Sequence, residues 1–178
     1  MDYNDYNDKT VLVTGGAGCV GSNLTRKLSE YAEKVIILDN LDSAYEWNIP
    51  EVENLHFVKG DILDDEMLKR VFKEKPDYVF HLAAHFANQN SVDNLELDLM
   101  VNGMGILKVL EYAHLVGVER FVYSSSGCGV YGLDSKMPFE EPDISISLHT
   151  PYQVTKLIGE LYTNYFHNLY GLPIVNAR

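Results

Sequence analysis

Short apolar runs recur along the chain and alternate with longer segments whose apolar residues are spaced as on one face of a helix. Two of the runs, Val11–Val13 and Val35–Leu38, are apolar at every position. Such runs are typical of strands in a parallel sheet that is covered on both faces. Six strands are predicted: Thr10–Thr14, Val35–Asp39, His56–Lys59, Tyr78–His81, Arg120–Ser125 and Ile174–Ala177.

Four helices are predicted between the strands, over Val20–Glu33, Asp64–Lys75, Val92–Val116 and Tyr152–Tyr170. The first places Leu24 and Leu28 four residues apart, on one face. The second begins with acidic residues, which suit the positive end of a helix, and stops before Pro76. The fourth ends at Gly171, a common C-cap residue. Leu133–Thr150 is predicted to be a loop over the strand ends.

Strands that alternate with helices predict βαβ units with right-handed crossovers. The fold class is therefore α/β, with a doubly wound parallel sheet of the Rossmann type. Residues 1–8 repeat Tyr-Asn-Asp and are predicted to be a solvated acidic tail. Residues 9–178 are predicted to form one domain.

Composition narrows the class of protein. A net charge of -12 argues against a general nucleic-acid binder, which needs cationic surface. No uninterrupted apolar run approaches the roughly 20 residues that span a bilayer, and the polar, acidic start is unlike a signal peptide. Cys19 and Cys128 are too few for a disulfide framework and lack metal-ligand spacing. We therefore expect a soluble, cytoplasmic protein without a metal, a nucleic-acid partner or a membrane partner.

Three glycines directly follow the first predicted strand and open the first predicted helix. In this segment, Gly15, Gly18 and Gly21 permit a sharp turn, close approach of a pyrophosphate and tight packing of helix on strand. The helix N-terminus then presents free N–H groups to the phosphates. Asp39 closes the second strand, where an acid accepts the ribose hydroxyls of NAD and repels the extra phosphate of NADP. The alternative for Asp39 is a loop-entry or capping role.

Tyr152 and Lys156 are four residues apart, so on a helix they share a face. Beside a nicotinamide, the lysine ammonium would stabilise the phenolate of Tyr152, a candidate general base and acid for a sugar or alcohol hydroxyl. The same spacing also arises by chance in many helices. The serines Ser124–Ser126 end the fifth predicted strand, where open α/β sheets bind ligands. A hydroxyl there would bind the reacting oxygen or cap a helix.

Taken in order, these motifs resemble the extended short-chain dehydrogenase/reductase family, which contains the NAD-dependent nucleotide-sugar epimerases and dehydratases. The likeness covers about residues 9–178. It also rests on the segments Asp39-Asn40-Leu41, Gly60-Asp61-Ile62, His81-Leu82-Ala83-Ala84, Val130-Tyr131-Gly132 and Pro151-Tyr152. The resemblance implies that Tyr152, Lys156 and Ser126 are catalytic, with Ser125 as the alternative hydroxyl. The residues that it implies for NAD binding are Gly15, Gly18, Cys19, Val20, Gly21, Asp39, Asn40, Asp61, Ile62, Leu82, Ala83, Ala84, Asn102, Ser124, Tyr152 and Lys156.

Two departures from the family pattern affect these expectations. Three residues, Gly127–Gly129, separate Ser126 from the Val130-Tyr131-Gly132 motif, where some members have two. Counting back from that motif reaches Gly127, which carries no hydroxyl, so Ser126 is preferred. Family members also continue beyond the position of Arg178 into a substrate-binding portion of comparable size. The chain is therefore expected to be a fragment, or a domain that binds NAD without turnover.

The resemblance implies NAD-dependent epimerisation of a nucleotide-activated sugar, at C4 of a UDP-hexose, by a homodimer. The alternatives are a 4,6-dehydratase or reductase of the same family, and a non-catalytic NAD-binding or sensor protein. Dehydratases usually carry an Asp-Glu pair after the catalytic hydroxyl, whereas Gly127 and Cys128 follow Ser126 here. A sensor would not need Tyr152 and Lys156 together with that serine. The epimerase is therefore preferred.

Overall fold

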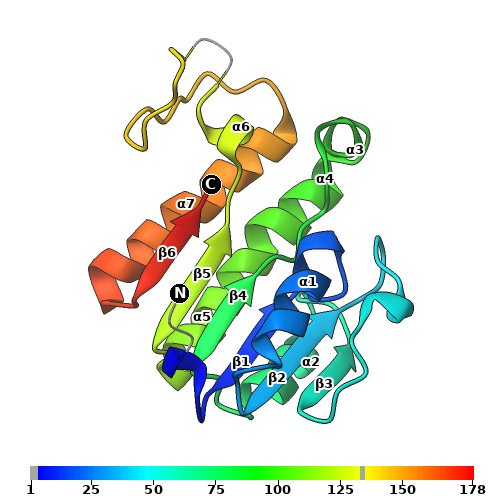
Figure 1. Cartoon of the computed structure of the whole chain (residues 1–178). Helices are drawn as coiled ribbons and strands as arrows, with labels where there is room; N and C mark the ends of the chain where they lie inside the picture. Colours follow the sequence, from blue (N-terminus) through cyan, green and yellow to red (C-terminus); the bar gives the residue numbers. More distant parts are fainter. Residues whose placement is uncertain (1–3, 133–134) are drawn as a thin grey trace.

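A computed structural model describes residues 4–132 and 135–178, and its centre is a single parallel sheet (Figure 1). The strands are β1 (Thr10–Thr14), β2 (Lys34–Asp39), β3 (Leu55–Lys59), β4 (Tyr78–His81), β5 (Arg120–Ser124) and β6 (Ile174–Ala177). Their order in the sheet is β3-β2-β1-β4-β5-β6. The predicted doubly wound α/β fold is confirmed, and each predicted strand boundary lies within about one residue of the observed one.

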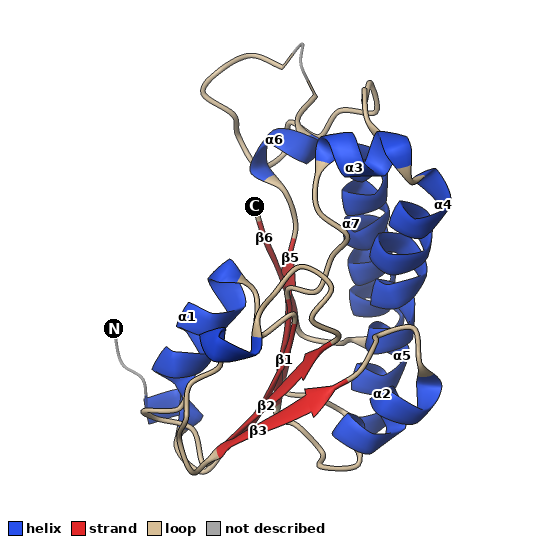
Figure 2. Cartoon of the chain, turned by 90° about the vertical axis from the view of Figure 1, so that its right-hand side faces the viewer, coloured by secondary structure: helices blue, strands red, loops and turns tan. Residues whose placement is uncertain are grey.

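Helices flank the sheet unevenly (Figure 2). Helix α1 (Cys19–Leu28) lies on one face, whereas α2 (Asp65–Phe72), α5 (Ile106–Val116) and α7 (Pro151–Tyr170) lie on the other. The shorter elements are η1 (Asn4–Tyr6), η2 (Glu46–Asn48), α3 (Asn88–Asp93), α4 (Leu95–Asp98), the π-helical η3 (Leu99–Gly105) and α6 (Gly127–Val130). Right-handed crossovers explain this distribution, because the sheet grows in opposite directions from β1.

The two faces of the sheet are buried to different extents. On the face toward α2, α5 and α7, buried residues include Leu12, Ile36, Leu68, Leu110 and Phe121. On the other face, Leu28 of α1 packs in a smaller core with Val13. Phe80, Val122 and Val175 are register neighbours across β4, β5 and β6, and Val175 is 42% exposed. In the described part of the chain, no helix covers that region (Figure 1).

The first helix is shorter than predicted. It ends at Leu28 rather than at Glu33, and its C-cap is Ser29. The side-chain amide of Asn54 donates to the carbonyls of Ser29 and Ala32 at 3.1 and 2.9 Å. These two long-range hydrogen bonds hold the segment in a turn that leads into β2.

The third predicted helix, Val92–Val116, is interrupted. Asn94 has non-helical backbone angles and separates α3 from α4, and the following Leu99–Gly105 segment is π-helical. The continuous helix Leu95–Val116 is long and apolar enough to cross a membrane by length and composition alone. Core helices of soluble proteins pass the same test, and part of this helix contributes to the main hydrophobic core.

Two predicted irregular segments are only partly described. Residues 1–3 of the predicted tail and residues 133–134 of the predicted loop lie outside the described residues. Tyr6 is partly buried and packs against Tyr78, with ring centroids 5.4 Å apart. Residues 135–150 contain no helix or strand, which confirms the predicted loop over its described part.

Candidate active site

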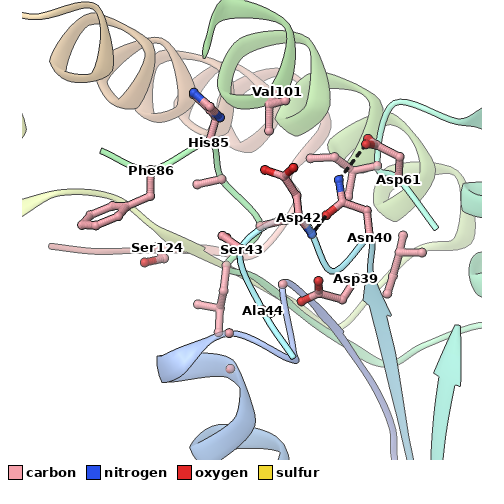
Figure 3. Close-up of a pocket in the computed structure, with 18 of the residues that line it drawn as sticks. Asp39, Asn40, Asp42, Ser43, Ala44, Asp61, His85, Phe86, Val101 and Ser124 are labelled. Atoms are coloured by element: carbon pink, nitrogen blue, oxygen red, sulfur yellow. Dashed lines mark hydrogen bonds between the residues drawn. The ribbon is translucent and has the colours of Figure 1, made fainter. Parts of the chain in front are cut away.

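A pocket of about 610 Å³ lies at the carboxyl ends of the strands, where the strand order reverses. This is the usual ligand site of an open α/β sheet, and the volume is typical of a ligand pocket. Every residue predicted to bind the cofactor lines it except Asn102. Figure 3 shows Asp39, Asn40 and Asp61 in one part of the pocket and Phe86 and Ser124 in another.

The glycine turn brings backbone close to backbone at the base of the pocket. Gly15 has a φ of +72°, and a Cβ there would lie 2.6 Å from the amide nitrogen of Ala83. A Cβ at Gly21 would lie 2.2 Å from the carbonyl oxygen of Gly15. Gly18 is the N-cap of α1 and provides no side-chain cap for its first N–H groups. The turn is therefore shaped to receive a pyrophosphate at the start of a helix.

Acidic and amide side chains form the end of the pocket beyond β2. One carboxylate oxygen of Asp39 accepts the N–H of Ala17 at 2.9 Å, and the other accepts the N–H of Leu41 at 2.9 Å. Asn40 donates to the carboxylate of Asp61 at 2.9 Å (Figure 3). Asp39 thus organises the loop entry and also lines the pocket, so the two roles considered for it are compatible.

Tyr152 and Lys156 lie together in the first turns of α7, beside the end of β5. Lys156 is 4% exposed, and its ammonium donates to the carbonyl of Ser124 at 2.9 Å. The same nitrogen lies 5.6 Å from the ring centroid of Tyr152. Burial lowers the pKa of Lys156 to about 8, although the negative charge of Asp98 opposes this effect. The pair can therefore serve as a proton-transfer group with a cation beside it.

The three consecutive serines have different surroundings. Ser124 lines the pocket. The Ser125 hydroxyl donates to the buried carboxylate of Glu160. The Ser126 oxygen accepts the N–H of Gly129 at 3.0 Å as the N-cap of α6, and Ser126 is not among the pocket-lining residues. Catalytic roles for Ser126 and Ser125 stay predictions.

Asn102 acts behind the pocket wall. It is 3% exposed, and its side-chain oxygen accepts the N–H of His85 at 2.8 Å while its amide donates to the His85 carbonyl at 3.0 Å. Sequence reasoning missed Phe86, Leu97 and Val101 among the lining residues. Leu97 and Val101 are four residues apart, a spacing that suggests a shared helix face but not which ligand or element it contacts.

No group of three His, Cys, Asp or Glu side chains is placed to hold a metal ion within residues 4–132 and 135–178. The expected absence of a metal stays a prediction. The residues that line the pocket fit a dinucleotide instead, because they join a phosphate-binding turn to an acid at the end of β2.

Comparisons with known proteins place these features in one family. The sequence profile of the NAD dependent epimerase/dehydratase family matches residues 11–178. The chain is 39% identical to a UDP-glucose 4-epimerase of Mycolicibacterium smegmatis, over 90% of this chain and 52% of that protein. The chain therefore spans about half the length of the curated relatives it matches.

Two solved structures agree with this assignment. An epimerase from Methanothermobacter thermautotrophicus is 82% identical, with a TM-score of 0.97 over 99% of this chain and 52% of that chain. A UDP-glucose 4-epimerase from Thermus thermophilus, in complex with NAD, is 34% identical, with a TM-score of 0.87 over 95% of this chain and 54% of that chain. The profile match and the shared fold confirm the resemblance found in the sequence, and the chain belongs to the NAD dependent epimerase/dehydratase family.

Proposed function

We propose that the protein uses NAD to epimerise a nucleotide-activated sugar at C4 of a UDP-hexose. The observation that carries this proposal is the placement of Tyr152 and Lys156 beside Ser124, in the same pocket as the glycine turn. A proton-transfer pair and a dinucleotide cradle share one cavity. The family of the chain and the names of its relatives support the choice of cofactor and substrate class.

Several pocket residues have a defined role in this proposal. The N–H groups at the start of α1 hold the pyrophosphate, and Asp39 accepts the ribose hydroxyls. Bound NAD supplies a reversible acceptor for the hydride of the sugar carbon. Tyr152 takes the proton of the sugar hydroxyl and later returns it. The Lys156 ammonium, held by the carbonyl of Ser124, favours the phenolate of Tyr152.

The alternatives have less support. A dehydratase needs an acid and a base for the loss of water, and no acidic residue follows Ser126 before the Val130-Tyr131-Gly132 motif. A protein that only bound NAD would not require a buried lysine near the ring of Tyr152. Epimerisation uses both residues and requires no further acid pair.

The substitution Tyr152→Phe tests the proposal in the protein at its natural length. We expect turnover of UDP-glucose to UDP-galactose to fall by at least about 100-fold, because the general base is lost. Binding of NAD, measured by calorimetry, should stay within about threefold of the wild type, since only one hydroxyl is removed and the glycine turn and Asp39 are unchanged. Unchanged turnover in the variant would contradict the role of Tyr152, and failure of the original protein to bind NAD would contradict the whole proposal.

We also propose that the protein is a homodimer whose interface is the exposed apolar surface of two adjacent helical segments. Val154, Leu161, Tyr165 and Leu169 share the face of α7 opposite its buried residues. The adjacent π-helical segment adds exposed Leu99, Met100 and Met104. We call this set of seven residues the apolar helix face. Large exposed apolar patches are typical of interaction sites.

The substitution Leu161→Glu tests the dimer. A charge in the centre of the apolar helix face should convert the dimer to a monomer in sedimentation experiments at micromolar concentration. Val52→Glu is the matched control, because Val52 is exposed in the loop before β3, outside this face. If the wild-type protein sediments as a monomer, the dimer proposal is wrong.

A further inference from the structure

Asp98 is a buried carboxylate that the predicted site did not include. Asp98 lies in the short helix α4 and is 0% exposed. Its two oxygens accept hydrogen bonds from neutral groups, the Asn102 amide at 2.8 Å and the Thr155 hydroxyl at 2.7 Å. In the described part of the chain, no salt bridge reaches it. A buried charge without an ionic partner is costly, so Asp98 depends on these two hydrogen bonds.

The two hydrogen bonds lead to two different walls of the pocket. Asn102 holds the backbone N–H and carbonyl of His85, directly after the pocket-lining residues Leu82–Ala84. Thr155 lies in α7 between Tyr152 and Lys156. A single carboxylate thus connects the wall that follows β4 with the turn that carries the proton-transfer pair.

We propose that Asp98 is a positioning residue, which sets the Leu82–His85 wall and the Tyr152–Lys156 turn in the relative position that the cofactor site requires. This inference rests on the proposed function, because it assigns purpose to the same pocket. It places a determinant of the site 57 positions before Thr155 in the sequence, in a different helix from the catalytic pair. Asp98 itself does not line the pocket.

The charge of Asp98 gives the connection a measurable consequence. The titratable groups that face Lys156 are His81 on β4, Tyr123 on β5, Tyr152 on α7 and Asp98 on α4. Burial keeps His81 and Tyr123 neutral at neutral pH, since it lowers the pKa of the first and raises that of the second. The negative charge of Asp98 opposes the loss of the Lys156 proton, against the effect of burial.

The substitution Asp98→Asn removes the charge and keeps the shape. The new amide oxygen can accept from Asn102, and the new NH₂ can donate to the hydroxyl oxygen of Thr155. The Thr155 hydroxyl can then donate to the Tyr152 carbonyl, which is 3.2 Å away. We expect the pKa of Lys156, followed by the NMR shift of its ε-carbon in ¹³C-lysine-labelled protein, to fall by about one unit. NAD binding should weaken more at pH 8 than at pH 6.5. The exposed acid of the same helix provides the control Glu96→Gln, which should change neither measurement.

The substitution Thr155→Val separates the hydrogen bond from the charge. It leaves the Asp98 carboxylate without one buried donor, so we expect NAD binding by calorimetry to weaken roughly tenfold. Thr155→Ser restores the hydroxyl and should restore binding. If Asp98→Asn left the Lys156 titration unchanged, or Thr155→Val bound NAD like the original protein, the inference would be wrong. Neither measurement uses turnover, so a failure of the epimerase proposal would be recognised separately.

Discussion

At the scale of single residues, His81 shows how the sheet supports the site. Its imidazole is fully enclosed, and Nδ1 lies 2.8 Å from the hydroxyl of Thr14, which directly precedes the glycine turn. The rings of Phe121 and Tyr123 stack near it, with centroids 6.1 and 6.0 Å away. Burial, with a smaller contribution from the Lys156 charge, lowers the pKa of His81 to about 3. These contacts are those of a histidine packed in the core, with one ring nitrogen close to a hydroxyl of the neighbouring strand.

This shift predicts a specific loss of stability in mild acid. Between pH 6.5 and about pH 3 the unfolded chain binds a proton at His81 that the folded protein does not, so unfolding is favoured as the pH falls. In this range, the contribution of His81 to the free energy of unfolding should decrease by about 1.4 kcal/mol for each unit by which the pH falls. His81→Asn, which can still bond to Thr14, should show a shallower slope in urea titrations from pH 6 to pH 4.

The control for this experiment is His56→Asn, because His56 is exposed on β3. This variant should show the same dependence of unfolding free energy on pH as the wild type. Equal slopes for His81→Asn and the original protein would show that the buried imidazole does not contribute.

At the scale of elements, the start of α7 decides where the proton-transfer pair stands. The Thr150 hydroxyl oxygen accepts the N–H of Gln153 at 3.3 Å, and the Gln153 side chain accepts the N–H of Thr150 at 3.2 Å. This reciprocal capping box fixes the first turn of the helix, with Pro151 at its first position. Tyr152 lies within that turn.

Loss of the cap should therefore affect both stability and the site. Thr150→Ala is expected to lower the free energy of unfolding by about 1 kcal/mol in urea titrations. It should also weaken NAD binding, because the turn that holds Tyr152 and Lys156 frays. Thr150→Ser keeps the capping oxygen and should retain both properties. Full stability of the alanine variant would indicate that packing alone holds this helix end.

The elements that could be predicted from sequence are those with local causes. The run Val35–Leu38 needs no distant partner to indicate a buried strand, and Gly171 marks a helix end by its left-handed backbone, with a φ of +68°. The break at Asn94 and the π-helical Leu99–Gly105 segment have no such local signal. Helix α6 also escaped prediction, because its two glycines disfavour helix formation.

The same difference between local and long-range causes separates the site residues that were predicted from those that were missed. The residues predicted to bind the cofactor lie mostly in short motifs whose spacing is visible in the sequence. Asp98 and Glu160 were missed, because acidic residues in helices usually face solvent. Their partners are Thr155, 57 positions away, and Arg178, 18 positions away. Only the folded chain brings these groups together.

At the scale of the whole molecule, the pocket joins the two halves of the sheet. The turn after β1 and the end of β2 contribute Gly15 and Asp39, whereas the segment after β4, the end of β5 and helix α7 contribute Ala83, Ser124 and Tyr152. This complete pocket exists only in the folded protein. NAD bound there must therefore stabilise the folded state by mass action.

That coupling makes thermal unfolding a test of the cofactor and of its specificity. NAD at 100 times its dissociation constant should add about 2.7 kcal/mol, which corresponds to a rise in Tm of roughly 5–10 °C for a chain of this size. NADP at the same concentration should give a much smaller rise, because the hydrogen-bonded carboxylate of Asp39 repels its extra phosphate. In Gly21→Ala, the new Cβ would collide with the Gly15 carbonyl and distort the phosphate turn, so NAD should produce no rise. An equal rise with NADP would contradict the selectivity assigned to Asp39, and a normal rise in Gly21→Ala would place the dinucleotide elsewhere.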